Sequence, residues 1–398
     1  MLGHPADRPT VTLVPGRHKR ALAGHPWIYS NEVQMDPAAK ALPAGGLVTL
    51  QSVDRRALGV ATFNPHTLVA ARLLDRDPSR RIDADFIASR LARALEIRNR
   101  LYRDPYYRLV HAEADGLPGI VVDRYGTVAV AQLNTAGADL LETEIVRAIE
   151  GVLRPSAVVL RNDSAGRALE GLTSDVRLVM GSLENVEAHE NGARFPVDPM
   201  GGQKTGWFYD QRENRRFVAA LCREARVLDL YCFGGGFAIE AALAGASEIL
   251  GIDRSETALA LAERAAQMND VSARCQFRRG EIFAELQSML DRGERFDVVI
   301  SDPPAFVRSR KDLGPGLRGY RKLTRLAAGV TAARGYLFLA SCSHNVTPED
   351  FVETVKQGLN DADRQGRILL SAGAAPDHPT HPNLPESAYL KALVLALD

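Results

Sequence analysis

Apolar and polar residues follow three different patterns along the chain. Up to residue 75, short β-rich runs stand between Gly, Pro and Asn without a helical period, which predicts a small β-barrel or sandwich. Residues 76–184 combine a helical apolar period at 82–102 with several strands, including a predicted hairpin around Tyr125-Gly126. We therefore expect a β-barrel domain at 1–75 and a small α+β central domain at 76–184.

The third pattern runs from residue 185 to the C-terminus. It opens with a predicted hairpin that has Asn191-Gly192 at its turn. Apolar strands without polar alternation then alternate with helices, which is typical of a buried, mostly parallel sheet covered on both faces. We therefore expect 185–398 to be a Rossmann-like α/β domain. Its predicted strands are 225–232, 247–253, 274–283, 296–304 and 335–343.

The composition is that of an ordinary globular protein. Apolar residues make up 45% of the chain and charged residues 25%, and no apolar run reaches the roughly 18 to 20 residues that cross a bilayer. The first ten residues lack the apolar core of a secretory signal. The four cysteines form neither a disulfide framework nor a paired C-x-x-C zinc site. We expect a cytoplasmic protein without a metal site or membrane span, as a monomer or homodimer.

The net charge is zero, so the overall charge gives no support for a nucleic-acid partner. Between Arg308 and Arg325, however, seven basic residues stand against one acid, and such a local patch can bind phosphates on a neutral protein. A second arginine-rich stretch, 72–103, is diluted by acids and fits a solvated helix face with ion pairs equally well. The predicted RNA contacts of the first stretch are Arg308, Arg310, Lys311 and Arg321.

A ligand site is expected beyond the carboxyl ends of the strands of the α/β domain. The loop after the first strand contains Gly234, Gly235 and Gly236, which let the backbone approach a ligand closely. The second strand ends at Asp253, 24 residues after Asp229, where a carboxylate can accept hydrogen bonds from two ribose hydroxyls. These features alone fit either NAD or S-adenosylmethionine.

Two features favour S-adenosylmethionine. The glycine spacing departs from G-x-G-x-x-G, and the fourth strand ends in Asp302-Pro303-Pro304-Ala305-Phe306. That segment resembles the motif of S-adenosylmethionine-dependent nucleic-acid methyltransferases, in which an acid or amide before Pro-Pro stands beside the transferred methyl group and the target base. The alternative is a rigid turn at the strand end. Glu281 follows the third strand, at the position where such enzymes place an acid near the adenine amine. That acid is more often Asp than Glu.

The fifth strand leads into Ser341-Cys342-Ser343-His344, on the same rim as the glycine loop. C5 of cytosine or uracil is a poor nucleophile, and a thiolate that adds to C6 activates it for attack on the sulfonium methyl group. Because the thiolate is the reactive form, we expect positive neighbours, and His344 and the basic stretch at 308–325 are candidates. The predicted catalytic residues are Cys342, Asp302 and Pro303. Cys222 and Cys275 fit buried apolar positions, and Cys232 fits the lining of the loop.

Blocks in a fixed order cover most of the chain: GRHKRALAGHPWIYSNEV, HAEADGLPGIVVDRYG, GGQKTGWFYDQRENR, LDLYCFGGGFA, SDPPAFV, GYRKL, SCSHNVT, HP and PESAYLK. Together they resemble the RNA cytosine-C5 methyltransferases that modify large-subunit (23S) ribosomal RNA, in their three-domain bacterial form. The glycine loop departs from that pattern, since it reads CFGGG where the family often has SYTGG. The substitution removes one hydroxyl that could bond the cofactor.

The resemblance implies a class I methyltransferase domain with S-adenosylmethionine, preceded by an RNA-binding PUA β-barrel, and 23S ribosomal RNA as partner. It implies that Lys204, Phe208, Asp210, Gln211 and Arg212 border the cofactor or target pocket. Arg212 and Arg215 either bind phosphate or fix the fold. The implied RNA contacts of the barrel are Arg17, Lys19 and Arg20, with Trp27 either among them or in the barrel core. The expected cofactor-binding residues are Phe208, Gln211, Asp229, Gly234, Gly235, Gly236, Asp253, Glu281 and Asp302.

Two other functions fit the same residues. In the first, the Asp302-Pro303 segment holds an exocyclic amine of adenine or guanine, and Cys342 is dispensable. In the second, the protein is a non-catalytic RNA-binding assembly factor with a relic cofactor fold. The intact set of glycines, Asp253, Asp302 and Cys342 argues against such a relic.

Overall fold

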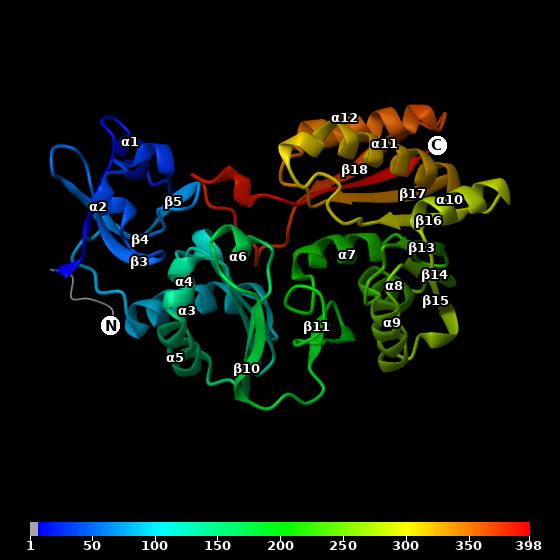
Figure 1. Ribbon diagram of the computed structural model, residues 1–398. Coiled ribbons are helices and arrows are strands. Elements are labelled where there is room, and N and C mark those ends of the chain that lie inside the picture. The colour runs from blue at the N-terminus through cyan, green and yellow to red at the C-terminus, as the bar shows by residue number, and fades with distance from the viewer. Residues whose placement is uncertain (1–6) are drawn as a thin grey trace. The chain divides into compact units, whose positions relative to one another are not determined.

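The computed structural model describes residues 7–398, and residues 1–6 of the segment searched for a secretory signal lie outside the described part (Figure 1). The chain divides into two compact units. Unit 1 holds the described residues up to Val186, with Asp198–Trp207 and Pro376–Ser387. Unit 2 holds Glu187–Val197, Phe208–Ala375 and Ala388–Asp398. No helix within residues 7–398 is long and apolar enough to cross a membrane.

The first part of unit 1 is a sheet of strand order β1-β3-β4-β5-β2 around its own apolar core. Four of its strands were predicted from their apolar runs. The strand β2 was missed because three residues, Trp27–Tyr29, are too few to show an alternation. The elements are β1 (Thr10–Thr12), α1 (His18–Leu22), β2 (Trp27–Tyr29), η2 (Ser30–Glu32), α2 (Pro37–Lys40), β3 (Gly46–Gln51), β4 (Ala57–Phe63) and β5 (Val69–Asp75).

The second part of unit 1 is a sheet of order β10-β9-β8-β7-β6, against which α3 and α5 pack. The predicted hairpin at Tyr125-Gly126 is confirmed, since β7 and β8 pair antiparallel around it. The helix α3 begins where the Asp83 carboxylate accepts a hydrogen bond from the Phe86 N–H at 3.0 Å. The elements are α3 (Ala84–Leu101), β6 (Tyr106–His111), η3 (Ala112–Asp115), β7 (Ile120–Tyr125), β8 (Val128–Leu133), α4 (Ala136–Leu140), α5 (Glu142–Leu153), β9 (Ala157–Asn162), α6 (Gly166–Leu169), β10 (Asp175–Gly181) and η7 (Pro385–Ser387).

The two sheets of unit 1 share apolar and polar contacts. Val60 of β4 and Leu74 of β5 belong to the core of the second part. Trp27 is only half-buried, and its indole N–H donates to the Glu113 carboxylate at 2.8 Å. Trp27 therefore joins the two parts of unit 1. Of the two places open from the sequence, the barrel core is not the one it takes.

Unit 2 contains the predicted hairpin and the α/β sheet. The sheet has the order β15-β14-β13-β16-β17-β19-β18. The strands β15, β14, β13, β16 and β17 run parallel, β19 is antiparallel to them, and the edge strand β18, antiparallel to β19, runs in their direction again. The prediction of a mostly parallel sheet is confirmed. The strands are β11 (Glu187–Glu190), β12 (Ala193–Pro196), β13 (Arg226–Leu230), β14 (Glu248–Asp253), β15 (Cys275–Arg279), β16 (Phe296–Ser301), β17 (Thr331–Ser341), β18 (Gly366–Ala372) and β19 (Lys391–Leu397).

Helices cover both faces of this sheet (Figure 1). On one face α7, α8 and α9 pack in succession, and on the other α10, α11 and α12 do so. Apolar side chains of α10, α11 and α12 form one continuous core with those of the strands. The helical elements are η4 (Tyr209–Gln211), α7 (Arg212–Ala219), α8 (Gly236–Leu243), α9 (Glu256–Met268), η5 (Ser272–Arg274), α10 (Ile282–Asp291), η6 (Arg310–Asp312), α11 (Leu313–Val330) and α12 (Pro348–Asp361).

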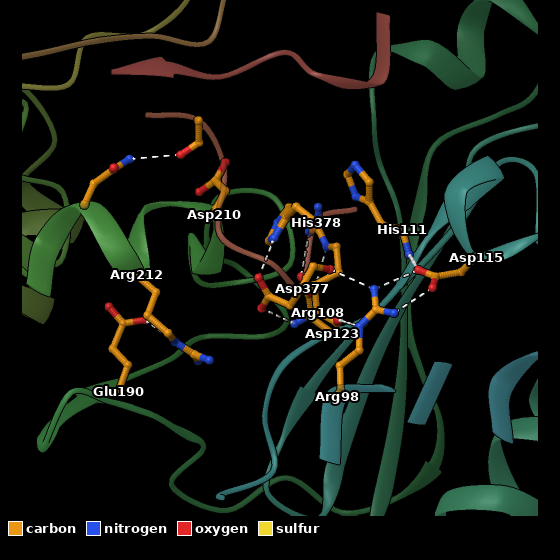
Figure 2. Close-up of polar contacts among 12 residues, drawn as sticks. Arg98, Arg108, His111, Asp115, Asp123, Glu190, Asp210, Arg212, Asp377 and His378 are labelled. Atoms are coloured by element: carbon orange, nitrogen blue, oxygen red, sulfur yellow. Dashed lines mark hydrogen bonds and ion pairs between the residues drawn. The ribbon is translucent and has the colours of Figure 1, made fainter. Parts of the chain in front are cut away.

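A buried charge network ties the segment Pro376–Ser387 to α3, β6 and η3 of unit 1 (Figure 2). The Arg98 guanidinium donates to both Asp115 oxygens at 2.6 and 2.8 Å and to the Asp377 carbonyl at 2.8 Å. The Asp377 carboxylate accepts the Arg108 backbone N–H at 3.0 Å and contacts the His378 ring at 2.8 Å. Arg98 is 1% exposed, so the loss of either partner would leave the other charge of its pair with Asp115 buried and uncompensated.

Replacing Arg98 with Leu is therefore expected to destabilise unit 1 by about 3–5 kcal/mol, because it leaves the Asp115 carboxylate buried and unpaired. Urea unfolding followed by tryptophan fluorescence measures the change. Both tryptophans of the chain, Trp27 and Trp207, belong to unit 1, so the signal reports that unit.

Arg93→Leu is the matched control on the same helix. Its pair with Glu96 is exposed, and little change in the urea midpoint is expected. Equal midpoints for Arg98→Leu and the control would contradict the role given to the buried pair.

Candidate active site

The sheet of unit 2 brings the predicted site residues to one edge. The strand β13 lies between β14 and β16, and β16 lies next to β17, all parallel. The loops that follow these strands therefore meet at the carboxyl edge, where the strand order reverses. They contribute the glycine loop, Asp253, Asp302 and Cys342.

The glycine loop follows a backbone path that few residues adopt. Tyr231, Phe233 and Gly235 have positive φ angles of 60°, 47° and 78°. A Cβ at Gly236 would lie 2.5 Å from the Arg215 Nε, so glycine is required there for packing. The helix α8 begins at Gly236, and its first N–H groups stand at the end of this loop. The loop thus combines close backbone approach with a helix N-terminus.

Asp253 holds the glycine loop from the next strand. Its carboxylate accepts hydrogen bonds from the Phe233 N–H at 3.1 Å and from the Ser255 N–H at 2.8 Å. The residue is half-exposed, and each carboxylate oxygen has further lone pairs for an outside donor. An acceptor of this kind beside a glycine loop fits the two ribose hydroxyls of an adenosyl group.

Asp229 lies beneath the loop, with 1% of its surface exposed. Its Oδ2 accepts the Ala238 N–H in the first turn of α8 at 3.1 Å. Burial raises the pKa of the Asp229 carboxyl to about 8, although that hydrogen bond acts in the opposite direction and the charges of Asp302 and Asp253 add to the rise. The position suits a group that fixes the start of α8.

Glu281 and Phe208 approach the loop from two other elements. Glu281 precedes α10 and caps it, since its Oε2 accepts the Ala284 N–H at 3.0 Å. Burial raises the pKa of the Tyr231 hydroxyl, and the Glu281 charge adds to that rise, which places the carboxylate near the loop. The Phe208 ring stands edge-on to Phe233, with 5.0 Å between the ring centroids.

The block that precedes α7 is divided between the two units. Lys204 belongs to unit 1, whereas Phe208, Asp210, Gln211 and Arg212 belong to unit 2. Gln211 is buried, and its Oε1 accepts from the Asn214 side chain at 2.6 Å. The Asp210 Oδ2 accepts the Tyr389 hydroxyl at 2.5 Å.

Arg212 and Arg215 bind a carboxylate of the hairpin. Both are 5% exposed and pair with Glu190 of β11, Arg212 at 3.5 Å, and Figure 2 shows Arg212 beside Glu190. Glu240 of α8 also lies near Arg215 and interacts with it electrostatically. Of the two alternatives open from the sequence, phosphate binding or fixing the fold, these contacts favour fixing the fold.

A single hydroxyl joins the loop after β16 to the loop after β17. The Tyr320 hydroxyl of α11 accepts from the Ser341 Oγ at 2.9 Å and from the Phe306 N–H at 3.5 Å, and it lies 2.9 Å from the Ser343 Oγ. Ser343 Oγ in turn accepts the Val307 N–H at 3.2 Å. These bonds tie the loop that contains Asp302-Pro303, through Phe306 and Val307, to the serines on either side of Cys342. Pro303 is buried, and Asp302 and Cys342 are half-buried.

Tyr320 was not predicted as a site residue from the sequence. Its signal was the GYRKL block, in which Gly319 accompanies the tyrosine. A Cβ at Gly316, one turn earlier, would lie 2.2 Å from a Val307 methyl group, so α11 needs a glycine to approach the Asp302-Pro303 loop.

The four cysteines have different surroundings. Burial raises the pKa of Cys222 to about 12 and that of Cys275 to about 11. Burial also raises the pKa of Cys232, which is 5% exposed behind the loop. Cys275 is only partly buried, so the predicted buried position is confirmed for Cys222 and wrong for Cys275. Cys342 follows the last residue of β17 at the site edge.

The predicted RNA contacts divide into free and paired side chains. Arg17, Lys19, Arg308, Arg310 and Lys311 are exposed and form no ion pair with any residue in 7–398. Arg321 instead forms a double hydrogen bond with Asp361 of α12 at 2.6 and 2.7 Å. Arg20 pairs with Glu32 at 3.1 Å and lies over the Tyr29 ring.

The buried carboxyl of Asp229 makes stability depend on pH. In the native chain it stays protonated up to about pH 8, whereas in the unfolded chain it ionises near its ordinary value of 3.8. The stabilisation that the protonated Asp229 carboxyl gives the folded chain is complete below pH 3.8 and is lost as the pH rises to about 8. Because a tenfold change in proton affinity equals about 1.4 kcal/mol, the loss is on the order of a few kcal/mol.

We therefore expect Asp229→Asn to lose less stability than the unmodified chain between pH 5 and pH 8. Urea unfolding followed by circular dichroism at both pH values measures the difference. Asp297→Asn, which changes an exposed carboxylate of the same sheet, is the control. Equal pH dependence for the Asp229→Asn variant and the unmodified chain would contradict the burial argument.

Comparisons with known proteins agree with this geometry. A family model described as S-adenosylmethionine-dependent methyltransferase matches residues 161–396, and one described as PUA-like domain matches residues 11–76. A protein of Pseudoalteromonas atlantica named ribosomal RNA large subunit methyltransferase I is 34% identical over 389 residues, which cover 96% of this chain and 98% of that protein.

Solved structures share the fold. A SAM-dependent methyltransferase from Streptococcus mutans superposes with a TM-score of 0.82 at 20% identity, covering 98% of this chain and all of the other. A methyltransferase crystallised as a complex with SAH also gives 0.82, at 19% identity over 98% of this chain and 99% of that one. Since one family model matches more than half of the sequence and a relative at 34% identity spans nearly all of it, the chain belongs to the S-adenosylmethionine-dependent methyltransferases, in the family of the proteins named ribosomal RNA large subunit methyltransferase I.

Proposed function

We propose that this protein transfers a methyl group to C5 of a cytosine in large-subunit (23S) ribosomal RNA, with Cys342 as the nucleophile. The observation that carries the proposal is the position of Cys342. It stands just after β17, in a loop that the Tyr320 hydroxyl network joins to Phe306 and Val307 of the loop that begins with Asp302-Pro303. A thiol at this edge is needed for carbon methylation and has no task in methylation of an exocyclic amine.

The cofactor of the family fits the glycine loop and the carboxylates around it. S-adenosylmethionine supplies an electrophilic methyl group on a sulfonium. We expect Asp253 to accept the ribose hydroxyls, Glu281 to accept the adenine amine, and Phe208 to cover one side of the bound group. The other residues proposed to hold it are Gln211, Asp229, Gly234, Gly235, Gly236 and Asp302.

The chain's own residues then carry the covalent steps. The Cys342 sulfur donates an electron pair to C6 of the cytosine, which makes C5 nucleophilic toward the methyl group. Asp302 and Pro303 hold the base edge beside the point of transfer. Loss of the C5 proton to a base and departure of the thiolate from C6 restore the aromatic ring and the free cysteine.

Ribosomal RNA as the substrate rests on the names of the relatives and on the PUA-like match at residues 11–76. We propose that 1–75 binds RNA through Arg17, Lys19 and Arg20, that 76–184 links the domains, and that 185–398 catalyses the reaction. Arg308, Arg310 and Lys311 are exposed next to the Asp302-Pro303 loop in sequence and suit phosphate contacts, with Arg321 behind them. We propose a cytoplasmic location, where ribosomal RNA is found.

Asp253→Ala is expected to weaken S-adenosylmethionine binding by about 10- to 100-fold, because charge-assisted hydrogen bonds contribute roughly 1.5–3 kcal/mol. Isothermal titration calorimetry measures the dissociation constant. Glu263→Ala, which changes an exposed carboxylate of α9, is the control. Unchanged affinity in Asp253→Ala would contradict the assignment of the ribose site.

Cys342→Ala is expected to abolish formation of 5-methylcytosine while leaving S-adenosylmethionine binding within a few-fold of the unmodified chain. The measurement is nucleoside mass spectrometry of 23S ribosomal RNA from a strain that lacks the gene, after incubation with each protein. Cys222→Ala, which changes a buried cysteine before the start of β13, is the control.

Methylation by Cys342→Ala at the unmodified rate would eliminate the covalent C5 mechanism. Mass spectrometry that finds methyl groups on adenine or guanine amines would instead support the amine alternative. Absence of both methylation and cofactor binding in the unmodified protein would support an assembly factor.

A further inference from the structure

Lys391, the first residue of β19, lies beside the loop that carries Cys342. It pairs directly with Ser341, the last residue of the antiparallel β17. Its Nζ donates to the Ser343 carbonyl at 2.6 Å and to the Tyr389 carbonyl at 2.8 Å. The ammonium group is thereby fixed on the carbonyl of the residue that directly follows Cys342.

The Lys391 side chain is buried without a carboxylate partner. It is 6% exposed, and none of the residues in 7–398 forms an ion pair with it. Lysine is rarely buried unless its charge is compensated. An ammonium has three N–H groups, and the two carbonyls accept two of them, which leaves one for a neighbouring acceptor.

The Cys342 thiol lies in the electrostatic surroundings of this ammonium. Burial lowers the pKa of Lys391 to about 8, and Cys342 is the charged group that acts against this decrease. The ammonium and the sulfur are therefore close enough for their charges to interact.

We infer that Lys391 is a positioning residue that holds Cys342 as a thiolate before the substrate binds. The inference rests on the proposed function of Cys342 as the nucleophile. In this step the thiol proton passes to water, the sulfur keeps the electron pair, and the ammonium compensates the new negative charge. The sulfur then has its lone pair available for the bond to C6.

Three other titratable groups lie near Cys342. Tyr320 of α11 is neutral and occupied with Ser341 and Ser343. Asp302 follows the neighbouring strand β16 and carries the sign that opposes a thiolate. The His344 ring packs on Tyr389 at 5.4 Å between centroids, and the Tyr389 hydroxyl donates to Asp210.

The test measures the rate of alkylation of Cys342 by iodoacetamide between pH 5.5 and pH 10. The full-length protein is used without RNA or cofactor, and mass spectrometry follows the peptide that contains residue 342. In the unmodified chain, the midpoint of the pH–rate profile is expected below the ordinary thiol value of about 8.5. In Lys391→Met, alkylation at pH 7 is expected to slow by about tenfold and the midpoint to rise by about one pH unit.

Lys391→Arg is the matched variant, since it keeps the positive charge, and it is expected to restore most of the shift. Cys342→Ala confirms the identity of the alkylated peptide, and circular dichroism confirms that each variant is folded. Equal midpoints in the unmodified chain and a folded Lys391→Met variant would overturn the inference. If Lys391→Met does not fold, a midpoint at or above about 8.5 in the unmodified chain overturns it by itself.

These outcomes separate the inference from the proposed function. Loss of 5-methylcytosine in Cys342→Ala together with an unchanged midpoint in Lys391→Met would refute the role of Lys391 alone. A shifted midpoint together with full activity of Cys342→Ala would refute the nucleophile but leave the ammonium–thiolate pair.

Discussion

The parallel pairing of β13, β14, β16 and β17 is the constraint on which the rest of the site depends. Parallel strands in register end at the same edge, so every loop that follows them meets the others there. The glycine loop, Asp253, Asp302 and Cys342 come from four separate parts of the sequence and share one rim for this reason. The antiparallel strand β19 then returns alongside β17 and brings Lys391 to the same rim.

Side chains of the same chemical type acquire different properties at this edge because their surroundings differ. Asp229 is fully covered and becomes a neutral group near pH 7, while Asp253 at the end of the next strand stays half-exposed and holds the loop. Among the cysteines, burial raises the thiol pKa of Cys222, Cys232 and Cys275. Cys342 instead lies beside a buried ammonium. Local environment, more than residue type, separates supporting groups from reactive ones.

Buried charges fix the segments that carry little secondary structure. In unit 1 the pair of Arg98 and Asp115 also binds the segment around Asp377, which is far from both in sequence. In unit 2 Glu190 pairs with both Arg212 and Arg215 and so attaches the hairpin β11–β12 to α7. Such pairs stabilise a fold only when both partners are present, which makes them sensitive to single substitutions.

The sequence by itself determined the regular elements and the residue types at the strand ends, because apolar periodicity and the glycine and proline positions are local properties. It therefore predicted the α/β domain, the glycine loop, Asp253, Asp302 and the special position of Cys342. The tertiary structure alone decided the pairings between distant side chains. Tyr320 as the link between two loops, Glu190 as the partner of the arginines and Lys391 as the neighbour of Cys342 depend on how strands and helices pack, and no local pattern in the sequence records such contacts.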